Sequence, residues 1–302
     1  MHYHLSGLIP ATFTPLNADG SLHLGLIEPM VDFLISQKLT GLYVCGSTGE
    51  GVSLSTAERK TVAAAFVKAT RGRVPVILQV GHTSLVEAQE LAAHAQAIGA
   101  DAISAVPPFY FKPATLEANV RCMAQIAGAA PDLPYYYYHI PQMTGVQVDV
   151  ASLLAAGGRM IPNLVGAKYS IHDVYNLQAA AELENGRFNL LFGSDEMLLS
   201  GLAAGAQGAV GTTYNFAAPV FNRIVDAFAA NDIATAQMHQ GQMVQMIRLV
   251  ASYGGVPAFK AVMKFLGFDC GPVRLPLQAL SPQKEEELKA DLTRIGFFQW
   301  IK

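Results

Sequence analysis

The sequence lacks several features that would place it in other classes of protein. It has no stretch near the roughly 20 uninterrupted apolar residues of a membrane span, and its first residues, MHYHL, show no basic segment before an apolar run. Its three cysteines, Cys45, Cys122 and Cys270, have neither CxxC nor Cys/His spacing, which argues against a disulfide framework and a structural zinc site. We therefore expect a cytoplasmic protein.

Charged residues are also scarce. Lys, Arg, Asp and Glu make up 14% of the 302 residues, and the formal net charge is −3. This composition gives no sign of a surface for nucleic acid or an anionic membrane. No Walker lysine, HExxH or EF-hand pattern occurs, so no metal or phosphate site is indicated. We expect a small-molecule substrate and no nucleic-acid or membrane partner.

What the sequence does contain is an alternation of short apolar runs with longer segments of helical period, which is typical of repeated βα units. The runs predict eight strands, at residues 7–12, 41–45, 75–80, 102–106, 134–139, 164–169, 189–192 and 208–211. Eight units favour a (β/α)8 TIM barrel over a doubly wound open sheet, which would normally use fewer strands and place a Gly-rich phosphate turn early.

Helices dominate the rest of the chain. Ser55 and Ser84 are each followed three residues later by Glu, which predicts capping boxes at two helix starts. Beyond residue 215 the pattern predicts helices only, at residues 219–229, 233–252, 258–266 and 282–295. No low-complexity linker precedes them. We therefore predict a barrel at 1–215 and a C-terminal helical extension at 216–302 that packs on it as one structural unit.

Lys168 stands near the end of the sixth predicted strand, where barrel enzymes place catalytic groups. Burial among apolar neighbours disfavours an ammonium ion and favours the free amine that attacks a ketone. The alternative is a lysine that forms a structural pair or extends to the barrel rim. Lys112, Lys260 and Lys264 lie in a loop or in a helical segment, and we expect structural roles for them.

The fifth predicted strand carries four consecutive tyrosines. If its side chains alternate, Tyr136 and Tyr138 share the inner face, and Tyr138 lies nearer the catalytic end of the barrel. A phenol there suits proton transfer beside Lys168. We expect packing roles for Tyr135 and Tyr137, and a local hydrogen bond for His139.

Polar turns follow three other predicted strands. The turn at 46–51, GSTGEG, offers two hydroxyls and backbone N–H groups that suit a carboxylate, whereas its spacing fits a dinucleotide motif poorly. Asp195 and Glu196 stand at a helix start, where they either cap the helix or accept hydrogen bonds from sugar hydroxyls. The last turn, GTTYN at 211–215, adds further hydroxyls.

These motifs together resemble the dihydrodipicolinate synthase/N-acetylneuraminate lyase family of class I pyruvate-dependent aldolases. The resemblance rests on GSTGE at 46–50, YHIP at 138–141 and Lys168, and it spans essentially the whole chain. Within the family the chain is most similar to the N-acetylneuraminate lyases, through YYYHIP at 136–141, LFGSDE at 191–196 and GTTYN at 211–215.

The resemblance implies reversible cleavage of N-acetylneuraminate to N-acetylmannosamine and pyruvate by a homotetramer without a metal or organic cofactor. It implies that Lys168 forms the Schiff base, that Tyr138 transfers protons, and that the pyruvate carboxylate and the sugar bind to other residues of the site. The implied carboxylate ligands are Ser47 and Thr48; the implied sugar contacts are Ser170, Gly193, Asp195, Glu196 and Thr212; and Tyr110 is implied near the site at a subunit contact.

A few positions depart from the family pattern. Met143 stands where the synthases carry an arginine for a second carboxylate, which counts against the synthase activity. Ala167, Val256 and Pro257 also differ and are expected to reshape the pocket. Two alternatives therefore stay open: another pyruvate-dependent aldolase or dehydratase, such as a 2-keto-3-deoxy sugar acid aldolase or 4-hydroxy-tetrahydrodipicolinate synthase, and a non-catalytic barrel that binds a keto acid.

Overall fold

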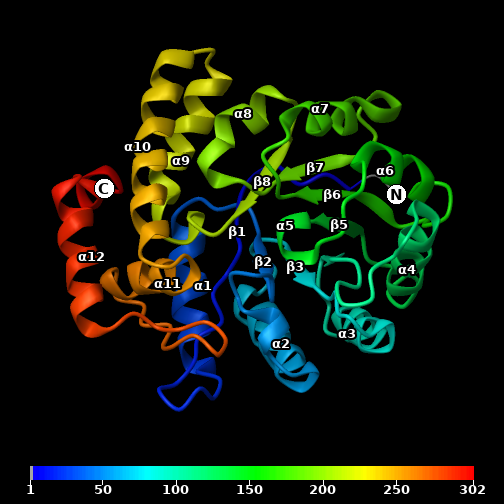
Figure 1. Ribbon diagram of the computed structural model, residues 1–302, viewed down its shortest axis with the longest axis horizontal. Helices are drawn as coiled ribbons and strands as arrows, with labels where there is room; N and C mark the ends of the chain where they lie inside the picture. Colours follow the sequence, from blue (N-terminus) through cyan, green and yellow to red (C-terminus); the bar gives the residue numbers. More distant parts are fainter. Residues whose placement is uncertain (1–2) are drawn as a thin grey trace.

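Eight parallel strands form the centre of the computed structural model, which describes residues 3–302 (Figure 1). The strands are β1 (Gly7–Pro10), β2 (Leu42–Val44), β3 (Val76–Gln79), β4 (Ala102–Ala105), β5 (Tyr135–His139), β6 (Leu164–Tyr169), β7 (Asn189–Phe192) and β8 (Gly208–Gly211). From β2 to β8 each strand pairs with the next, β8 pairs with β1, and an isolated bridge between Ala11 and Tyr43 joins the β1 edge to β2. The fold is therefore a TIM barrel.

Helices surround the strands and continue beyond them. Those between the strands are α1 (Ile27–Ser36), α2 (Thr56–Thr70), α3 (Leu85–Ala97), α4 (Leu116–Gly128), α5 (Pro141–Thr144), α6 (Val150–Gly157), α7 (Val174–Glu182) and α8 (Leu198–Ala203). After β8 come α9 (Tyr214–Ala229), α10 (Ile233–Ser252), α11 (Val256–Phe265), α12 (Pro282–Arg294) and α13 (Phe297–Trp300). Short 3-10 turns occupy η1 (Leu24–Leu26), η2 (Gly51–Ser53), η3 (Leu183–Asn185) and η4 (Asp195–Met197).

The predicted elements are present with small shifts. All eight strands end within two residues of their predicted bounds, and α10 has the predicted bounds of 233–252. Helix α9 begins at Tyr214 rather than at Pro219. Residues 214–218 are already helical, and Pro219 lies inside the helix. Helix α13 was not predicted. Among residues 3–302, no helix is both long and apolar enough to cross a membrane.

Only one of the two predicted capping boxes is complete. The Ser55 hydroxyl accepts from the backbone N–H of Glu58, and the Glu58 carboxylate accepts from the Ser55 N–H at 2.9 Å. At Ser84 the hydroxyl accepts from the Glu87 N–H, but the Glu87 carboxylate instead accepts a hydrogen bond from Thr56 on helix α2. A partner on the neighbouring helix therefore replaces the reciprocal half of the box.

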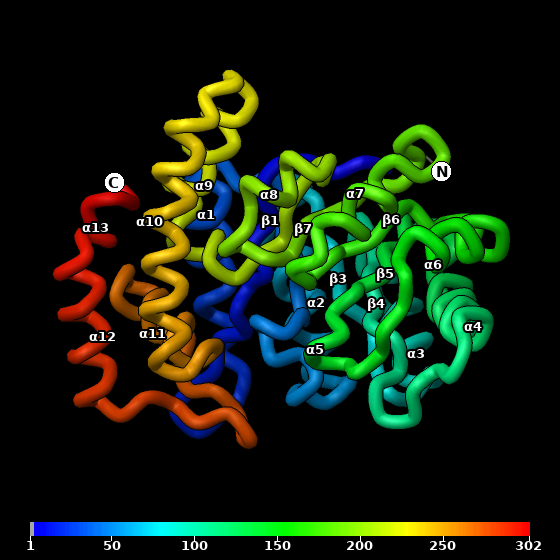
Figure 2. The backbone as a smooth tube through the Cα atoms, turned by 45° about the horizontal axis from the view of Figure 1, so that its top comes forward, coloured from blue at the N-terminus to red at the C-terminus, as the bar shows by residue number. Residues whose placement is uncertain are grey.

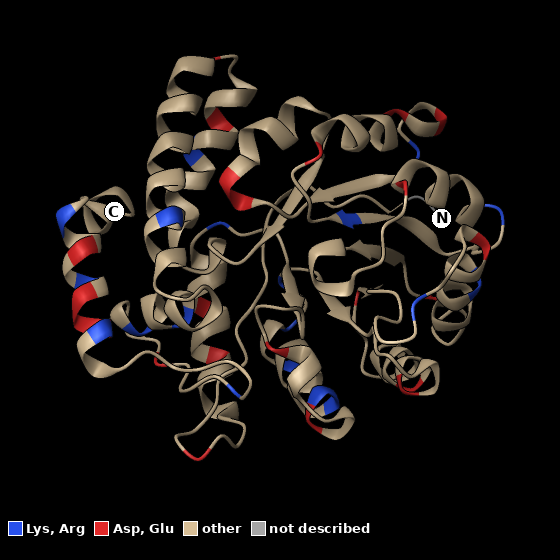
Figure 3. Cartoon of the chain, viewed as in Figure 1, with Lys and Arg blue, Asp and Glu red and all other residues tan. Residues whose placement is uncertain are grey.

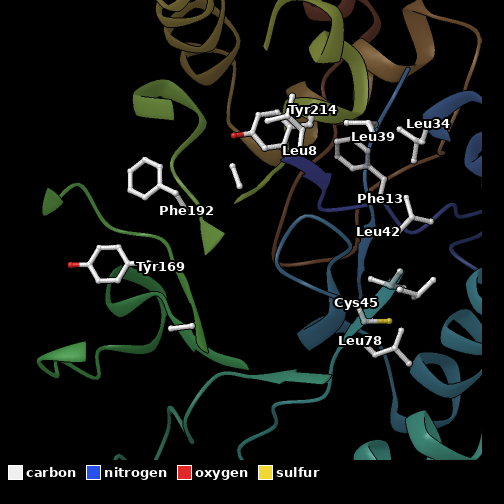
Figure 4. Packing of buried hydrophobic residues seen from close by; sticks show 14 of the residues in the cluster. Leu8, Phe13, Leu34, Leu39, Leu42, Cys45, Leu78, Tyr169, Phe192 and Tyr214 are labelled. Carbon is white, nitrogen blue, oxygen red and sulfur yellow. The ribbon is translucent and has the colours of Figure 1, made fainter. Parts of the chain in front are cut away.

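Alternation along the strands divides the core into two parts. An outer cluster lies between strands and helices; Figure 4 shows Leu8, Leu42 and Tyr169 among its members. An inner cluster fills the barrel and includes Tyr136 and Tyr138. Tyr135 and Tyr137 belong to the outer cluster, as predicted. The inner face of β5 therefore points its tyrosines toward the barrel axis.

Helices α10 to α13 gather on one side of the barrel, beside α9 and α1 (Figures 1 and 2). Helix α10 packs against α9 and α11, and α12 packs against α10, α11 and α13. The α11 segment also contacts the turn that follows β2, through Lys260 and Glu50. The division of the chain at residue 215 stays a prediction.

Candidate active site

A cavity of about 330 Å³ opens at the carboxyl ends of the barrel strands. Its wall is formed by residues that follow β2, β5, β6, β7 and β8, and by residues of α10 and α11. This is the face on which barrel enzymes bind their substrates. The lining includes Ser47, Thr48, Tyr138, Gln142, Met143, Lys168, Ser170, Gly193, Asp195, Glu196, Thr212, Ile247, Ala251, Val256 and Phe259.

Lys168 is the only Lys, Arg, Asp or Glu in the eight strands. Figure 3 shows that most charged residues lie on the helices and loops around the barrel. Lys168 is 4% exposed to solvent, and its side chain takes part in none of the ion pairs found within residues 3–302. Its Nζ lies 3.8 Å from the centre of the Tyr138 ring and 4.6 Å from that of Tyr43. An amine held between aromatic rings without a carboxylate partner is well placed to act as a nucleophile.

Tyr138 reaches this position because β5 and β6 pair in register, with Tyr138 opposite Lys168. Tyr43 of β2 packs edge-on against Tyr138, with ring centres 5.8 Å apart, and donates a hydrogen bond to the Ser104 hydroxyl at 3.1 Å. Sequence reasoning missed Tyr43. Its inward position could have been found from the alternation of residues 41–45, but its contact with a strand three places away in the sheet could not.

The turn after β2 is closed by its own backbone. The Glu50 N–H donates to the Ser47 carbonyl, and the Gly51 N–H donates to the Gly46 carbonyl. A Cβ on Gly51 would lie 1.9 Å from the Cys45 carbonyl oxygen, so only glycine fits there. The Thr48 hydroxyl lies 2.7 Å from that of Thr212, which joins this turn to the one after β8.

Ser47 completes the polar surface of the turn. Within residues 3–302, the Ser47 hydroxyl and the backbone N–H groups of Ser47 and Thr48 donate to no protein acceptor. Successive free donors of this kind bind anions such as a carboxylate. The structure thus brings Ser47 and Thr48 to the same cavity as Lys168.

Ser170 lies just beyond β6 with its hydroxyl buried, and that hydroxyl has no hydrogen-bond partner within the described chain. The backbone approaches it closely, since a Cβ on Gly193 would lie 2.0 Å from Ser170 Oγ. Buried hydroxyls without partners are uncommon in native structures. Ser170 is also among the residues that line the cavity.

Asp195 caps the segment after β8 rather than its own helix. Its Oδ2 accepts from both the N–H and the hydroxyl of Thr213, each at 2.7 Å. Burial raises the pKa of Asp195 to about 6, although the Thr213 hydrogen bonds and the charge of Lys168 act in the opposite direction. A Cβ on Gly211 would lie 1.7 Å from Asp195 Oδ1, so the carboxyl group needs a glycine beside it.

Glu196 lies at the rim of the cavity, where its carboxylate is 2.6 Å from His172 Nε2. Both side chains are partly exposed to solvent, so this pair adds little to stability. The Asp195 carboxylate is therefore held by Thr213, whereas the Glu196 carboxylate contacts His172 at the rim of the cavity.

Tyr110 is the one predicted site residue that the structure does not bring to the cavity. It follows β4, is 78% exposed, and packs edge-on against Phe111, which is 87% exposed. Its predicted position at a subunit contact involves a second copy of the chain. Of the departures from the family pattern, Val256 and Met143 line the cavity, whereas Ala167 is in the outer core and Pro257 lines a different hollow.

His139 lies on the opposite face of β5 from Tyr138. Its ring packs between those of Tyr137 and Tyr169, and burial lowers its pKa to about 4. The buried Nδ1 has no hydrogen-bond partner within residues 3–302, so the predicted local hydrogen bond through that atom is absent. The aromatic packing holds the ring instead, away from the cavity.

The lysines for which structural roles were predicted all lie outside the cavity. Lys260 forms a buried ion pair with Glu50, and Lys264 pairs with Glu285 at 2.8 Å. The Lys112 Nζ lies beside Gly145, where an added Cβ would meet it at 2.5 Å. No group of three or more His, Cys, Asp or Glu side chains in the described part of the chain is arranged to hold a metal ion.

Comparison with known proteins gives consistent matches along the whole chain. Residues 4–295 match the dihydrodipicolinate synthetase family. The N-acetylneuraminate lyase of Gallus gallus is 42% identical over 296 residues, 96% of each chain, and that of Homo sapiens is 39% identical over 301 residues, 98% of this chain and 94% of the other. The solved structure of Proteus mirabilis N-acetylneuraminate lyase is 37% identical, with a TM-score of 0.95 over 98% of this chain and 100% of that one.

Proposed function

Because the chain belongs to the dihydrodipicolinate synthetase family, we propose that it is a Schiff-base-forming lyase that cleaves N-acetylneuraminate reversibly to N-acetylmannosamine and pyruvate. The relatives named N-acetylneuraminate lyase align with nearly the full length of the chain at about 40% identity. Their structural counterparts share its fold closely. Among the activities of the family, these likenesses favour the sialic acid aldolase.

One observation carries the chemical assignment. Lys168 is a buried amine without a carboxylate partner in the described chain, and it stands at the catalytic face of the barrel beside Tyr138. A class I aldolase needs such an amine to attack the ketone and a nearby group to move protons. We infer that Lys168 is the Schiff-base lysine and that Tyr138 is its proton-transfer partner.

In the first half of the proposed reaction, Lys168 Nζ attacks the C2 ketone of the open-chain sugar acid and gives a carbinolamine. The Tyr138 phenol donates its proton to the departing hydroxyl group, which leaves as water. A cationic iminium and a phenolate remain beside each other. The positive nitrogen can now accept the electrons of the C3–C4 bond.

In the second half, the Tyr138 phenolate takes the proton of the C4 hydroxyl as the C3–C4 bond breaks. N-acetylmannosamine leaves as the aldehyde, and pyruvate remains on Lys168 as an enamine. The phenol then protonates C3, and the new iminium is hydrolysed by water, whose proton returns to the phenolate. Pyruvate and the free amine are released, and no external oxidant or reductant is needed.

The other cavity residues divide between the two ends of the substrate. Ser47 and Thr48 supply hydroxyl and N–H donors, which can bind the pyruvate carboxylate without placing a competing charge beside Lys168. The partnerless hydroxyl of Ser170 and the rim carboxylate of Glu196 fit sugar hydroxyls. Completing the proposed sugar contacts are Gly193, Asp195 and Thr212.

The residue at position 143 argues against the synthase activity. Met143 is 69% exposed and lines the cavity, and a thioether cannot pair with a second carboxylate. The part of the cavity proposed to bind the sugar is lined by the polar side chains of Glu196 and Gln142 and by the apolar side chains of Val256 and Phe259. A substrate with several hydroxyls and an N-acetyl group suits such a mixed lining.

Two further parts of the proposal concern the cell and the assembly. The exposed pair of Tyr110 and Phe111 supports a homotetramer in which Tyr110 approaches the site at a subunit contact, because exposed aromatic pairs commonly mark interfaces. The free thiols Cys45, Cys122 and Cys270 are consistent with a reducing cytoplasm. Size-exclusion chromatography with light scattering tests the assembly.

A substrate panel tests the function. We expect pyruvate to be released from N-acetylneuraminate much faster than from a 2-keto-3-deoxy sugar acid, as followed by coupled oxidation of NADH. Release from the deoxy sugar acid alone would establish a different aldolase. Absence of turnover with the whole panel, in protein that still binds pyruvate, would favour the non-catalytic barrel.

A further inference from the structure

The turn after β2 has a backbone that its own sequence does not favour. Glu50 adopts the left-handed conformation, with φ of 53°, in a position between two glycines. A non-glycine residue in this region is uncommon and costs free energy unless its surroundings hold it there. The side chain of Glu50 therefore has to supply contacts that compensate for its backbone.

Those contacts come from the C-terminal part of the chain. The Glu50 Oε1 lies 3.0 Å from Lys260 Nζ of α11, and its Oε2 accepts from the Arg274 backbone N–H at 2.8 Å. Lys260 also donates to the Pro272 carbonyl at 2.7 Å. The side chains of Glu50 and Lys260 are 1% and 3% exposed, so the pair is buried, and each oxygen of the carboxylate accepts one hydrogen bond.

A second ion pair, between Arg274 and Glu58, links the same two regions of the chain. The Arg274 guanidinium binds both oxygens of Glu58, at 2.8 and 2.5 Å, and Glu58 belongs to the capping box that starts α2. The segment from Glu50 to Glu58 is thus fixed at both ends to residues 260–274. Helix α11 itself lines the cavity through Val256 and Phe259.

We propose that Glu50 and Lys260 are a positioning pair that aims the Ser47–Thr48 donors at the carboxylate of the 2-keto acid. This role rests on the proposed function of the turn. The pair also leaves the turn without net charge, whereas an unpaired Glu50 would place a buried anion directly behind a site for a carboxylate. The helical extension therefore contributes to carboxylate binding at a turn that lies about 210 positions away from it in the sequence.

Variants of the pair test this role. In Lys260→Met the Glu50 carboxylate loses its ammonium partner. We expect the KM for pyruvate in the condensation direction to rise at least about tenfold, which is the effect of losing one charge-assisted hydrogen bond between the turn and the pyruvate carboxylate. The KM for N-acetylmannosamine should change less than about twofold, because its contacts lie elsewhere. The double variant Glu50→Gln/Lys260→Met removes both charges and should recover part of the pyruvate affinity.

Lys264→Met is the matched control. Lys264 belongs to the same helix and pairs with Glu285 at a similar distance, but its ion pair does not involve the turn after β2, and it does not line the cavity. Both KM values should stay at those of the wild type. If Lys260→Met does not fold, Glu50→Gln tests the positioning alone: it keeps the shape of the side chain but weakens its hold on Lys260, and the KM for pyruvate should still rise because the Ser47–Thr48 donors are displaced.

A merely structural role gives a different result: a lower unfolding temperature and a smaller active fraction, with both KM values unchanged. That result, in any folded variant of the pair, overturns the proposal. The pyruvate concentration that half-saturates the borohydride-trapped adduct provides a readout that needs only imine formation. If the wild type traps pyruvate but does not condense it with N-acetylmannosamine, the proposed function fails while the pair is still tested by this readout.

Discussion

Two tyrosines on the inner face of β5 should have opposite effects when their hydroxyl groups are removed. Tyr138 is 2% exposed, and its hydroxyl makes no hydrogen bond to the described residues, while its ring packs on Tyr43 and Lys168. Tyr138→Phe keeps the ring and leaves no protein group without its partner. We therefore expect a change in the free energy of unfolding below about 0.5 kcal/mol.

The rate should fall much further. Loss of a positioned proton-transfer group costs roughly 100- to 10,000-fold, which corresponds to about 3 to 5 kcal/mol of activation free energy. The binding of pyruvate should persist, because the carboxylate donors are untouched. Steady-state cleavage of N-acetylneuraminate gives kcat, and urea unfolding followed by circular dichroism gives the stability.

Tyr136→Phe is the matched control on the same strand. Its hydroxyl is buried and donates to Asn189 Oδ1 at 2.7 Å, and Asn189 keeps a second donor, the Leu5 N–H at 3.0 Å. Removing it should cost about 1 kcal/mol of stability and leave kcat within a few-fold of the wild type. A Tyr138→Phe enzyme with near-normal kcat, or a larger loss of kcat in Tyr136→Phe, would refute the assignment of roles.

Three further predictions concern Lys168 and Asp195. Lys168→Ala should abolish turnover with the fold intact, and residual aldolase activity above that of a heat-denatured control would contradict the role of this amine. The pKa of Asp195 lies at about 6 in the folded protein against an ordinary value of 3.8, so its contribution to stability is fully present below pH 3.8 and is lost as the pH rises through 6. Relative to Asp195→Asn, the wild type should therefore be stabilised by about 2 kcal/mol more at pH 4.5 than at pH 7; an equal difference at both values in urea titrations would show that the carboxyl group titrates normally. In Gly211→Ala the new Cβ would lie 1.7 Å from Asp195 Oδ1, which should displace the carboxyl group, cost about 1 to 3 kcal/mol of stability and raise the KM for N-acetylneuraminate; an unchanged KM would mean that Asp195 does not help to form the sugar site.

Much of the barrel could be predicted because its signals are local. Each strand is a short apolar run between turn residues, and this pattern alone located β6 and β7 with their correct ends. The neighbourhood of Lys168 and Tyr138 was also accessible, since adjacent strands of a parallel barrel pair in register. Local periodicity and one topological rule were enough for these features.

Other features depend on contacts between distant segments. The Glu50–Lys260 pair spans 210 positions, and nothing near either residue indicates its partner. The carboxyl group of Glu87 could not be assigned to Thr56 rather than to its own capping box for the same reason. Tyr110 shows a third limit, because its predicted contact involves a residue of another copy rather than of this chain.

The most direct test of the account is a mass-spectrometric one. The protein is incubated with N-acetylneuraminate or with pyruvate, reduced with borohydride and mapped by peptide. We predict the same pyruvate-sized adduct on Lys168 from both compounds, which would establish both the imine and the cleavage of the sugar acid. An adduct on another lysine, or none from either compound, would contradict the central claim that Lys168 is the Schiff-base residue of a sialic acid lyase.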